Sequence, residues 1–227
     1  MQTKEVNENA LIAQEYKNLL RNTYLSLSAA DKKLIRLAFE TAVDAHKDQR
    51  RKSGEPYILH PIAVAQIVAD QIGLGATSIA AALLHDVVED TSLTLDDIEL
   101  MFGESVAKIV DGLTKISKLS KDKRVSVQAE NFKKMLLTMN DDVRVILIKI
   151  ADRLHNMMTL AAMPEEKKVR IASETLYIYA PLAHRIGMYN IKTQLEDLAL
   201  KYTEPEVFAD IEQKIKESKE ERLEYIN

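Results

Sequence analysis

Apolar residues recur every three or four positions along most of the chain, which is the spacing of one face of an α-helix. After Ser28, for example, Leu34, Ala38 and Val43 follow this spacing. Ser28 itself predicts a helix start, because its hydroxyl can accept a hydrogen bond from a free N–H of the first turn. The pattern predicts helices over about 5–25, 28–46, 61–72, 78–90, 94–103, 104–118, 143–163 and 164–187, followed by a highly charged pair of helices from about residue 189 to the end.

One segment has the composition of a strand and the spacing of a helix. Residues 143–150, VRVILIKI, are dominated by β-branched residues, which favours a buried strand. However, no Gly or Pro interrupts the chain there for about 20 residues, and Leu147, Ile150 and Leu154 fall three or four apart, so we predict a helix. Two polar stretches, 50–61 and 120–128, interrupt the helical pattern, and we expect the second to be a mobile loop.

Composition favours an all-α fold. The 227 residues include only 6 Gly and 5 Pro, whereas sandwiches and barrels need these residues for turns every ~8–12 positions. The length fits one large domain, or one domain with an appendage. The final stretch, residues 214–227, is mostly charged, and we expect a helical connector there rather than part of a core.

Charge and cysteine content limit the kinds of partner and the kinds of metal ligand that the chain can have. Lys and Arg number 31 and Asp and Glu number 35, so there is no basic excess of the kind that binds nucleic acid. No apolar run approaches the ~18 residues that cross a bilayer, and the N-terminus lacks the apolar core of a signal peptide. We therefore expect a soluble, cytoplasmic protein. Without cysteine, any metal must be held by His, Asp, Glu or Asn, and there are only 5 His.

The segment ALLHDVVEDT, residues 82–91, places polar side chains where apolar ones are expected. Glu89 lies four positions after His85, and Asp90 lies four after Asp86, so on one helix each pair shares a face. Three carboxylates packed so closely repel one another unless a cation or solvent intervenes. The alternative is a solvated helix end with an incidental histidine.

A second polar face runs along the helix expected after residue 142. Asp152, His155, Asn156 and Thr159 stand at offsets of 0, 3, 4 and 7 beside a strongly apolar stripe. A structural ion pair between Asp152 and a nearby arginine, Arg144 or Arg153, is the alternative to a functional role.

Two further features lie in the 50–61 stretch. His60 precedes Pro61 at the expected start of a helix, where a capping or core role is as reasonable as ligation. Upstream of it, Arg51, Lys52 and Ser53 form a cationic loop, which is either solvated or able to bind an anion.

Taken together, these features indicate metal-assisted hydrolysis. Two His and two Asp offer mixed nitrogen and oxygen ligands, which suit Mn, Fe, Zn or Co. A metal lowers the pKa of its bound water enough to make a nucleophile near neutral pH. The remaining carboxylates could orient or deprotonate that water, and the cationic loop could bind an anionic substrate. This combination indicates hydrolysis of a phosphoester or phosphoanhydride.

Three motifs, RRKSGEPYILHP, LLHDVVEDT and KIADRLHNMMTL, resemble in order and spacing the hydrolase domain of the RelA/SpoT family. Members of that family make and degrade the alarmones guanosine tetra- and pentaphosphate, (p)ppGpp, in the stringent response. The domain belongs to the HD superfamily of helical metal-dependent phosphohydrolases. The resemblance extends over roughly residues 30–205, and it implies a bundle of about ten helices.

The resemblance also implies roles for individual residues. It leaves His46, His155 and His184 without a ligand role. It leaves open whether Lys115, Lys118, Lys121 or Arg170 contacts the pyrophosphates. The implied sets are His60, His85, Asp86 and Asp152 for one Mn²⁺; Glu89 and Asp90 for the attacking water; and Arg51, Lys52, Ser53, Asn156 and Thr159 for the guanine nucleotide.

The predicted organisation follows the long, bifunctional members of the family. We expect an N-terminal helix at 1–27, an HD hydrolase domain at 28–187, and a connector at 188–227 toward a synthetase domain that this chain lacks. The predicted reaction is manganese-dependent removal of the 3′-pyrophosphate of (p)ppGpp, giving GDP or GTP. The alternatives are an HD phosphohydrolase for another nucleotide, a catalytically silent alarmone-binding module, and a purely helical scaffold.

Overall fold

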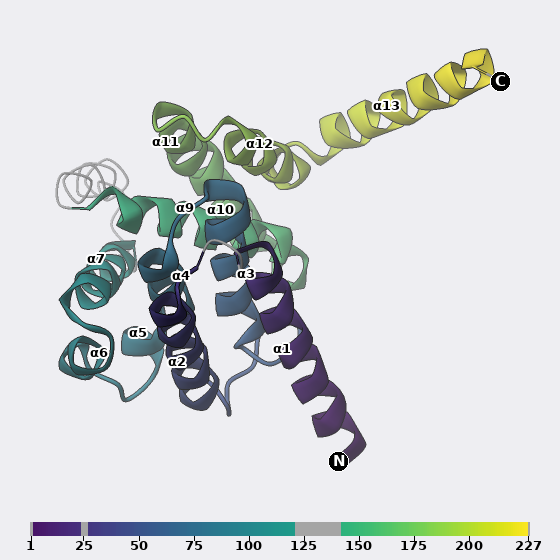
Figure 1. Ribbon diagram of the computed structural model, residues 1–227. Coiled ribbons are helices and arrows are strands. Elements are labelled where there is room, and N and C mark those ends of the chain that lie inside the picture. Colours follow the sequence, from purple (N-terminus) through teal and green to yellow (C-terminus); the bar gives the residue numbers. More distant parts are fainter. Residues whose placement is uncertain (1, 24–26, 121–141, 227) are drawn as a thin grey trace. The chain divides into compact units, whose positions relative to one another are not determined.

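The computed structural model describes residues 2–23, 27–120 and 142–226 (Figure 1). In these residues every regular element is helical, and one isolated bridge joins Arg50 and Pro56. The predicted all-α fold is therefore confirmed. The loop expected at 120–128 lies, beyond its first residue, outside the described residues.

The chain divides into two compact units, Met1–His155 and Asn156–Asn227. The expected bounds of an N-terminal helix, a hydrolase domain and a connector stay a prediction. The first unit contains α1 (Gln2–Thr23), α2 (Ala29–Ala45), α3 (Leu59–Ile67), η1 (Val68–Ile72), α4 (Ala76–Leu83), α5 (Val87–Asp90), α6 (Leu95–Phe102), α7 (Glu104–Ser120) and most of α9 (Val143–Met158). The second contains η2 (Leu160–Ala162), α10 (Glu165–Glu174), η3 (Thr175–Tyr179), α11 (Ala180–Arg185), α12 (Tyr189–Thr203) and α13 (Pro205–Ile226).

Helix α4 is the central element of the first unit. Its sequence, ATSIAAAL, is rich in alanine, and all of its side chains except that of Thr77 are buried. It packs against α2, α3 and α7, and Figure 1 shows α2, α3 and α4 side by side. Because alanine side chains are short, three helices can approach α4 closely, and the residues that follow α4 emerge inside the core.

Two helix starts are fixed by reciprocal side-chain bonds. The Ser28 hydroxyl accepts a hydrogen bond from the Asp31 N–H at 3.1 Å, and the Asp31 carboxylate accepts one from the Ser28 N–H at 3.0 Å. Thr94 and Asp97 make the same pair of bonds at the start of α6, at 3.2 and 2.8 Å. Both are capping boxes. The starts predicted at Ser28 and Thr94 are confirmed.

The segment 143–150 is helical, as predicted, and its β-branched residues reflect deep burial. Ile146, Ile148, Ile150 and Leu154 of α9 are all buried. Apolar side chains are thus buried on more than one side of this helix. This explains why the segment lacks the clean alternation of apolar and polar residues that a half-buried strand would show.

The continuous helix predicted over 78–90 is wrong. Helix α4 ends at Leu83, three residues form a turn, and α5 begins at Val87. The physical reason lies in His85, whose Nδ1 lies 2.8 Å from the carbonyl oxygen of Ala82. That carbonyl is one of those left free at the end of a helix, so the imidazole satisfies it and the chain turns.

In the second unit, α12 packs against α10, η3 and α11, and α13 packs against α12. Gly187 ends the preceding helical segment with φ of 80°, in the left-handed region that glycine adopts without strain. The residues of α13 from Glu212 to Lys219 are exposed. The expected connector at the charged end of the chain stays a prediction.

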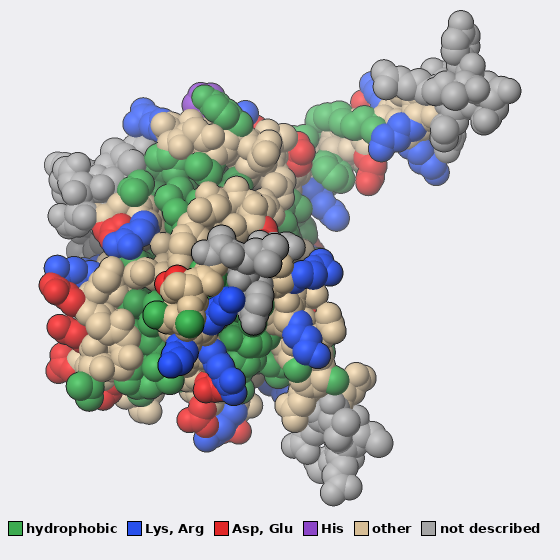
Figure 2. All heavy atoms as spheres, viewed as in Figure 1, with side chains coloured by type: hydrophobic (Ala, Val, Ile, Leu, Met, Phe, Trp, Pro, Cys, Tyr) green, Lys and Arg blue, Asp and Glu red, His purple; other side chains and the backbone are tan. Residues whose placement is uncertain are grey.

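The surface in Figure 2 carries both signs of charge, and the described helices lack the combined length and hydropathy of a membrane span. Figure 2 shows Lys and Arg side chains interspersed with Asp and Glu on the visible face, so the charge on that face is not of a single sign. Among the described residues, no helix has both the length and the apolar composition needed to cross a bilayer.

The close contact between α7 and α9 generates a stability prediction. A Cβ atom on Gly112 would stand 2.8 Å from Cγ2 of Val145, closer than such atoms approach in proteins. In an open helix, alanine is favoured over glycine by about 1 kcal/mol. We nevertheless expect Gly112→Ala to lower the free energy of unfolding by about 1–3 kcal/mol, measured by urea denaturation, because overpacking outweighs propensity.

The matched control is the same change in a Val145→Ala background. Without the Val145 methyl groups, Gly112→Ala should cost little or should stabilise the protein, giving a non-additive double-mutant cycle. A Gly112→Ala variant more stable than the original chain would contradict the packing of α7 on α9.

Candidate metal centre

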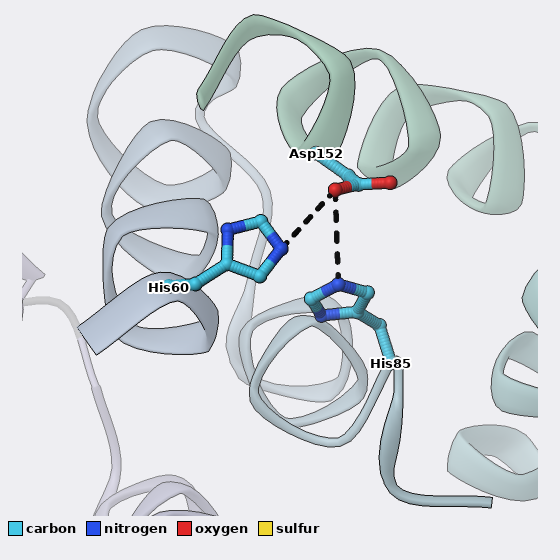
Figure 3. Close-up of side chains that lie close together, drawn as sticks. All are labelled: His60, His85 and Asp152. Atoms are coloured by element: carbon cyan, nitrogen blue, oxygen red, sulfur yellow. Dashed lines mark ion pairs between the residues drawn. The ribbon is translucent and has the colours of Figure 1, made fainter. Parts of the chain in front are cut away.

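Three buried polar side chains from separate elements meet in the first unit. Figure 3 shows His60 from α3, His85 from the turn after α4, and Asp152 from α9 pointing toward one another. The Nε2 atoms of His60 and His85 lie 3.2 and 3.9 Å from Oδ1 of Asp152. One potential ligand atom from each residue lies within 4.8 Å of the others, which is close enough for all three to bind one ion.

Asp86 completes the set of four predicted ligands at the edge of this cluster. Its Oδ2 lies 2.9 Å from Nε2 of His85 and 3.8 Å from Nε2 of His60. The Tyr57 hydroxyl donates a hydrogen bond to the same oxygen at 2.6 Å. Burial, together with the charge of Asp86, raises the pKa of Tyr57 far above its ordinary value, so the phenol remains a donor. The structure thus brings the four residues together.

One carboxylate oxygen of Asp152 pairs with a lysine, and the other faces the histidines. Lys149, one turn earlier on α9, donates to Asp152 Oδ2 at 2.8 Å and to the Ser117 hydroxyl at 3.0 Å. Asp152 Oδ1 therefore remains directed at the imidazoles. The structural alternative predicted an ion pair with Arg144 or Arg153. Arg144 instead binds Asp142 at 2.7 Å, and Asp152 pairs with Lys149.

The hydrogen bonding of His85 tests whether the cluster suits a cation. The Ala82 carbonyl can only accept, so Nδ1 of His85 carries the proton and Nε2 of the neutral ring carries a lone pair. That buried Nε2 has no hydrogen-bond partner, although Asp86 Oδ2 lies 2.9 Å away. A lone pair facing a carboxylate repels it unless a proton or a metal ion lies between them. The donors fit a divalent cation.

Neighbouring charges shift the pKa values of two residues in this cluster. Burial lowers the pKa of His85, but the charge of Asp86, its hydrogen bond with His85 and the charge of Asp152 together outweigh burial and raise the pKa to about 9. Burial raises the pKa of Asp152, but Lys149 and a hydrogen bond with His60 hold it well below its usual range. In the metal-free protein a proton on His85 therefore balances the carboxylates, and a bound cation would replace that proton.

His155, which the motifs leave without a role, contacts the site. Its Nδ1 lies 2.8 Å from Nδ1 of His60. For His60 to present a lone pair at Nε2, its Nδ1 must carry the proton and donate to His155. Burial, followed by the charges of His60 and Arg51, lowers the pKa of His155 to about 3, so its ring is neutral and can accept. The sequence feature that singled out His155 was its position three residues after Asp152, on the same face of the helix.

Glu89 and Asp90 follow the cluster within one turn of helix. Their backbone N–H groups donate to the Asp86 carbonyl at 3.1 and 2.9 Å, so the two carboxylates start from a fixed position beside a predicted ligand. Glu89 is half-buried and Asp90 is exposed. Their catalytic roles stay a prediction.

The predicted nucleotide loop forms a tight turn close to α1. Lys52 and Ser53 are exposed and Arg51 is half-buried. Arg50 instead forms an ion pair with Glu8 of α1, with both guanidinium–carboxylate contacts at 2.9 Å. The nucleotide-binding role of residues 51–53 stays a prediction.

The other residues predicted to contact the nucleotide lie in the second unit, on α7 or outside the described part. Asn156 and Thr159 belong to the second unit, where both are half-buried, and their role toward the base stays a prediction. Of the residues considered for the pyrophosphates, Lys115 pairs with Asp111, Arg170 is exposed in the second unit, and Lys121 and the side chain of Lys118 lie outside the described part.

Comparison with known proteins places these residues in a family context. The family model described as "HD domain" matches residues 38–189. A Vibrio cholerae protein named guanosine-3′,5′-bis(diphosphate) 3′-pyrophosphohydrolase is 47% identical over 215 residues, covering 95% of this chain and 29% of the relative. The Escherichia coli bifunctional (p)ppGpp synthase/hydrolase SpoT is 48% identical over 209 residues, covering 92% and 29%. The chain thus spans less than a third of these relatives' length.

A solved structure is also similar. Described as "A metazoan ortholog of SpoT hydrolyzes ppGpp and plays a role in starvation responses", it has a TM-score of 0.59 and 29% identity to this chain. The match covers 76% of this chain and 94% of the solved one. Together these similarities confirm the resemblance to RelA/SpoT hydrolase domains that the three motifs predict.

The contact between His155 and His60 gives a prediction about metal affinity. We expect His155→Ala to weaken binding of a divalent metal by roughly 10–100-fold, measured by isothermal titration calorimetry, because the acceptor that fixes the His60 ring is lost. His155→Asn is the control, since its Oδ1 can accept the same hydrogen bond and should retain most of the affinity. Equal affinity for the alanine variant and the original chain would refute an orienting role.

Proposed function

The chain belongs to the HD domain family, and on this basis we propose that it is a metal-dependent hydrolase that removes the 3′-pyrophosphate of (p)ppGpp. The observation that carries the proposal is the convergence of His60, His85 and Asp152, with donor atoms within 4.8 Å of one another. The printed names of the relatives support the choice of substrate. The products would be GDP or GTP and pyrophosphate, in cytoplasmic control of alarmone levels during the stringent response.

We propose Mn²⁺ as the resident ion. Two imidazoles and two carboxylates suit it, as they also suit Fe²⁺, Co²⁺ and Zn²⁺, and the resemblance to the RelA/SpoT hydrolase domain favours manganese. When bound, the ion would polarise phosphoryl oxygens and lower the pKa of a coordinated water. The proposed ligands are His60, His85, Asp86 and Asp152.

The adjacent carboxylates supply the acid–base chemistry. Glu89 and Asp90 would orient the attacking water and accept its proton as the oxygen attacks the phosphorus next to the ribose. The bond between that phosphorus and the ribose 3′ oxygen then breaks. The 3′ oxygen takes up a proton to become a hydroxyl, and pyrophosphate leaves. The place of Asp90 in the chain supports this role, because its backbone N–H donates to the carbonyl of the proposed ligand Asp86 at 2.9 Å.

The 51–53 loop would hold the guanine nucleotide. Two cationic side chains and one hydroxyl there match the negative charge and acceptor oxygens of a polyphosphorylated nucleotide. Lys52 and Ser53 are exposed and thus accessible to a ligand. Asn156 and Thr159 would contact the base.

The decisive experiment is pyrophosphate release from ppGpp by chelator-treated protein, with and without added Mn²⁺. We expect release only with the metal, and no release from GTP, which lacks a 3′-pyrophosphate. Binding of ppGpp without release in saturating Mn²⁺ would instead indicate a silent regulatory module. Faster hydrolysis of a nucleotide without the 3′-pyrophosphate would indicate another HD phosphohydrolase.

Two variants separate metal binding from proton transfer. Asp86→Ala should abolish both Mn²⁺ binding, measured calorimetrically, and turnover, because it removes a proposed ligand. Asp90→Asn should leave Mn²⁺ affinity unchanged and reduce kcat by about 10²–10⁴-fold, the usual contribution of a general base. Asp96→Asn, at an exposed position of α6, is the matched control and should behave like the original chain. Full activity of Asp90→Asn would show that the assigned role is wrong.

A further inference from the structure

A short hairpin, residues 49–57, carries the cationic loop at its tip and contacts the candidate metal centre through its two arms. Arg50 and Pro56 form an antiparallel bridge, and the Tyr57 N–H donates to the Gln49 carbonyl at 3.0 Å. These contacts close the base of the hairpin. Gln49 and Tyr57 therefore lie next to each other, one on each arm.

The tip of the hairpin is also internally bonded. The Arg51 N–H donates to the Glu55 carbonyl at 3.0 Å, and the Gly54 N–H donates to the Arg51 carbonyl at 2.9 Å. Gly54 has φ of 93°, a conformation that a side chain would strain. The exposed Lys52 and Ser53 are thus carried on an ordered turn.

Each arm reaches the catalytic segment after α4. From one arm, the Tyr57 hydroxyl donates to Oδ2 of Asp86 at 2.6 Å. From the other arm, Nε2 of Gln49 donates to the backbone carbonyl of Asp90 at 2.7 Å. The two bonds join positions that are 29 and 41 residues apart in the chain, so neither is a local contact.

A buried histidine supports both arms. Nδ1 of His46, at the end of α2, lies 2.8 Å from Oε1 of Gln49. Since that oxygen only accepts, His46 donates to it, and the amide nitrogen of Gln49 is thereby directed at Asp90. The His46 ring also packs against Tyr57, with 4.8 Å between ring centroids.

From this arrangement we propose that the 49–57 hairpin is a positioning element for catalysis, in which Tyr57 orients Asp86 and Gln49 fixes the backbone at Asp90. The element that carries the nucleotide-binding tip thus also holds a metal ligand and the proton acceptor. The inference rests on the proposed function for its effect on turnover, whereas its effects on metal affinity and backbone order do not depend on the substrate.

The test compares Tyr57→Phe and Gln49→Met with Glu55→Ala as the matched control in the same hairpin. Tyr57→Phe should weaken Mn²⁺ binding by roughly tenfold, measured by calorimetry, with kcat largely recovered at saturating Mn²⁺. Gln49→Met should leave Mn²⁺ affinity unchanged but lower kcat about tenfold at all metal concentrations. It should also speed amide hydrogen exchange over residues 87–92. Glu55→Ala should match the original chain in all three measurements.

A second variant guards against a general loss of stability. Gln49→Glu keeps the acceptor for His46 but places a carboxylate against the Asp90 carbonyl, so it should show the same loss of kcat and faster exchange as Gln49→Met. The proposal is overturned if Tyr57→Phe binds Mn²⁺ as tightly as the original chain and both Gln49 variants keep normal exchange over 87–92. If the original chain does not hydrolyse ppGpp, the proposed function fails, and calorimetry and exchange still decide this inference.

Discussion

The first unit is organised around the electrostatics of carboxylates held beside imidazole lone pairs in a mostly apolar interior. Such an arrangement is unstable without compensating charge, and the surrounding structure supplies part of it. Lys149 neutralises one oxygen of Asp152, and the Tyr57 hydroxyl satisfies one oxygen of Asp86. The Ala82 carbonyl fixes the protonated nitrogen of His85. The charge that remains requires a proton or a divalent cation at the centre.

The packing of the helices serves this requirement. The alanines of α4 allow α2, α3 and α7 to approach it, and the end of α4 then delivers His85 into the core. The same imidazole that faces the centre through Nε2 ends the helix through Nδ1. Helix termination and orientation of the imidazole are therefore one interaction, and a substitution at this position would disturb both the backbone and the cluster.

Local signals were sufficient to predict much of this structure. The starts at Ser28 and Thr94 follow from capping chemistry that lies within four residues. Polar interruptions of apolar segments drew attention to several candidate residues, and the resemblance to the RelA/SpoT hydrolase domain selected the four that cluster. The break after Leu83 could not be predicted, because the periodicity continues through it while a side chain ends the helix. Nor could the contacts of His155 and Gln49, because each depends on a partner brought close only by the tertiary fold. Residues 121–128 lie outside the described part, so the prediction of a mobile loop at 120–128 stays untested.

The ion pair between Arg50 and Glu8 shows that α1 is more than an appendage, since it fastens one arm of the hairpin to the first helix. Half of the arginine side chain is exposed, at 48%, so dissolved ions can screen this pair, whereas the Tyr57 and Gln49 bonds do not depend on paired surface charges. The hairpin is thus held by attachments of two kinds. Its link to the candidate metal centre contains no pair of opposite charges, whereas its link to α1 weakens as the salt concentration of the surroundings rises.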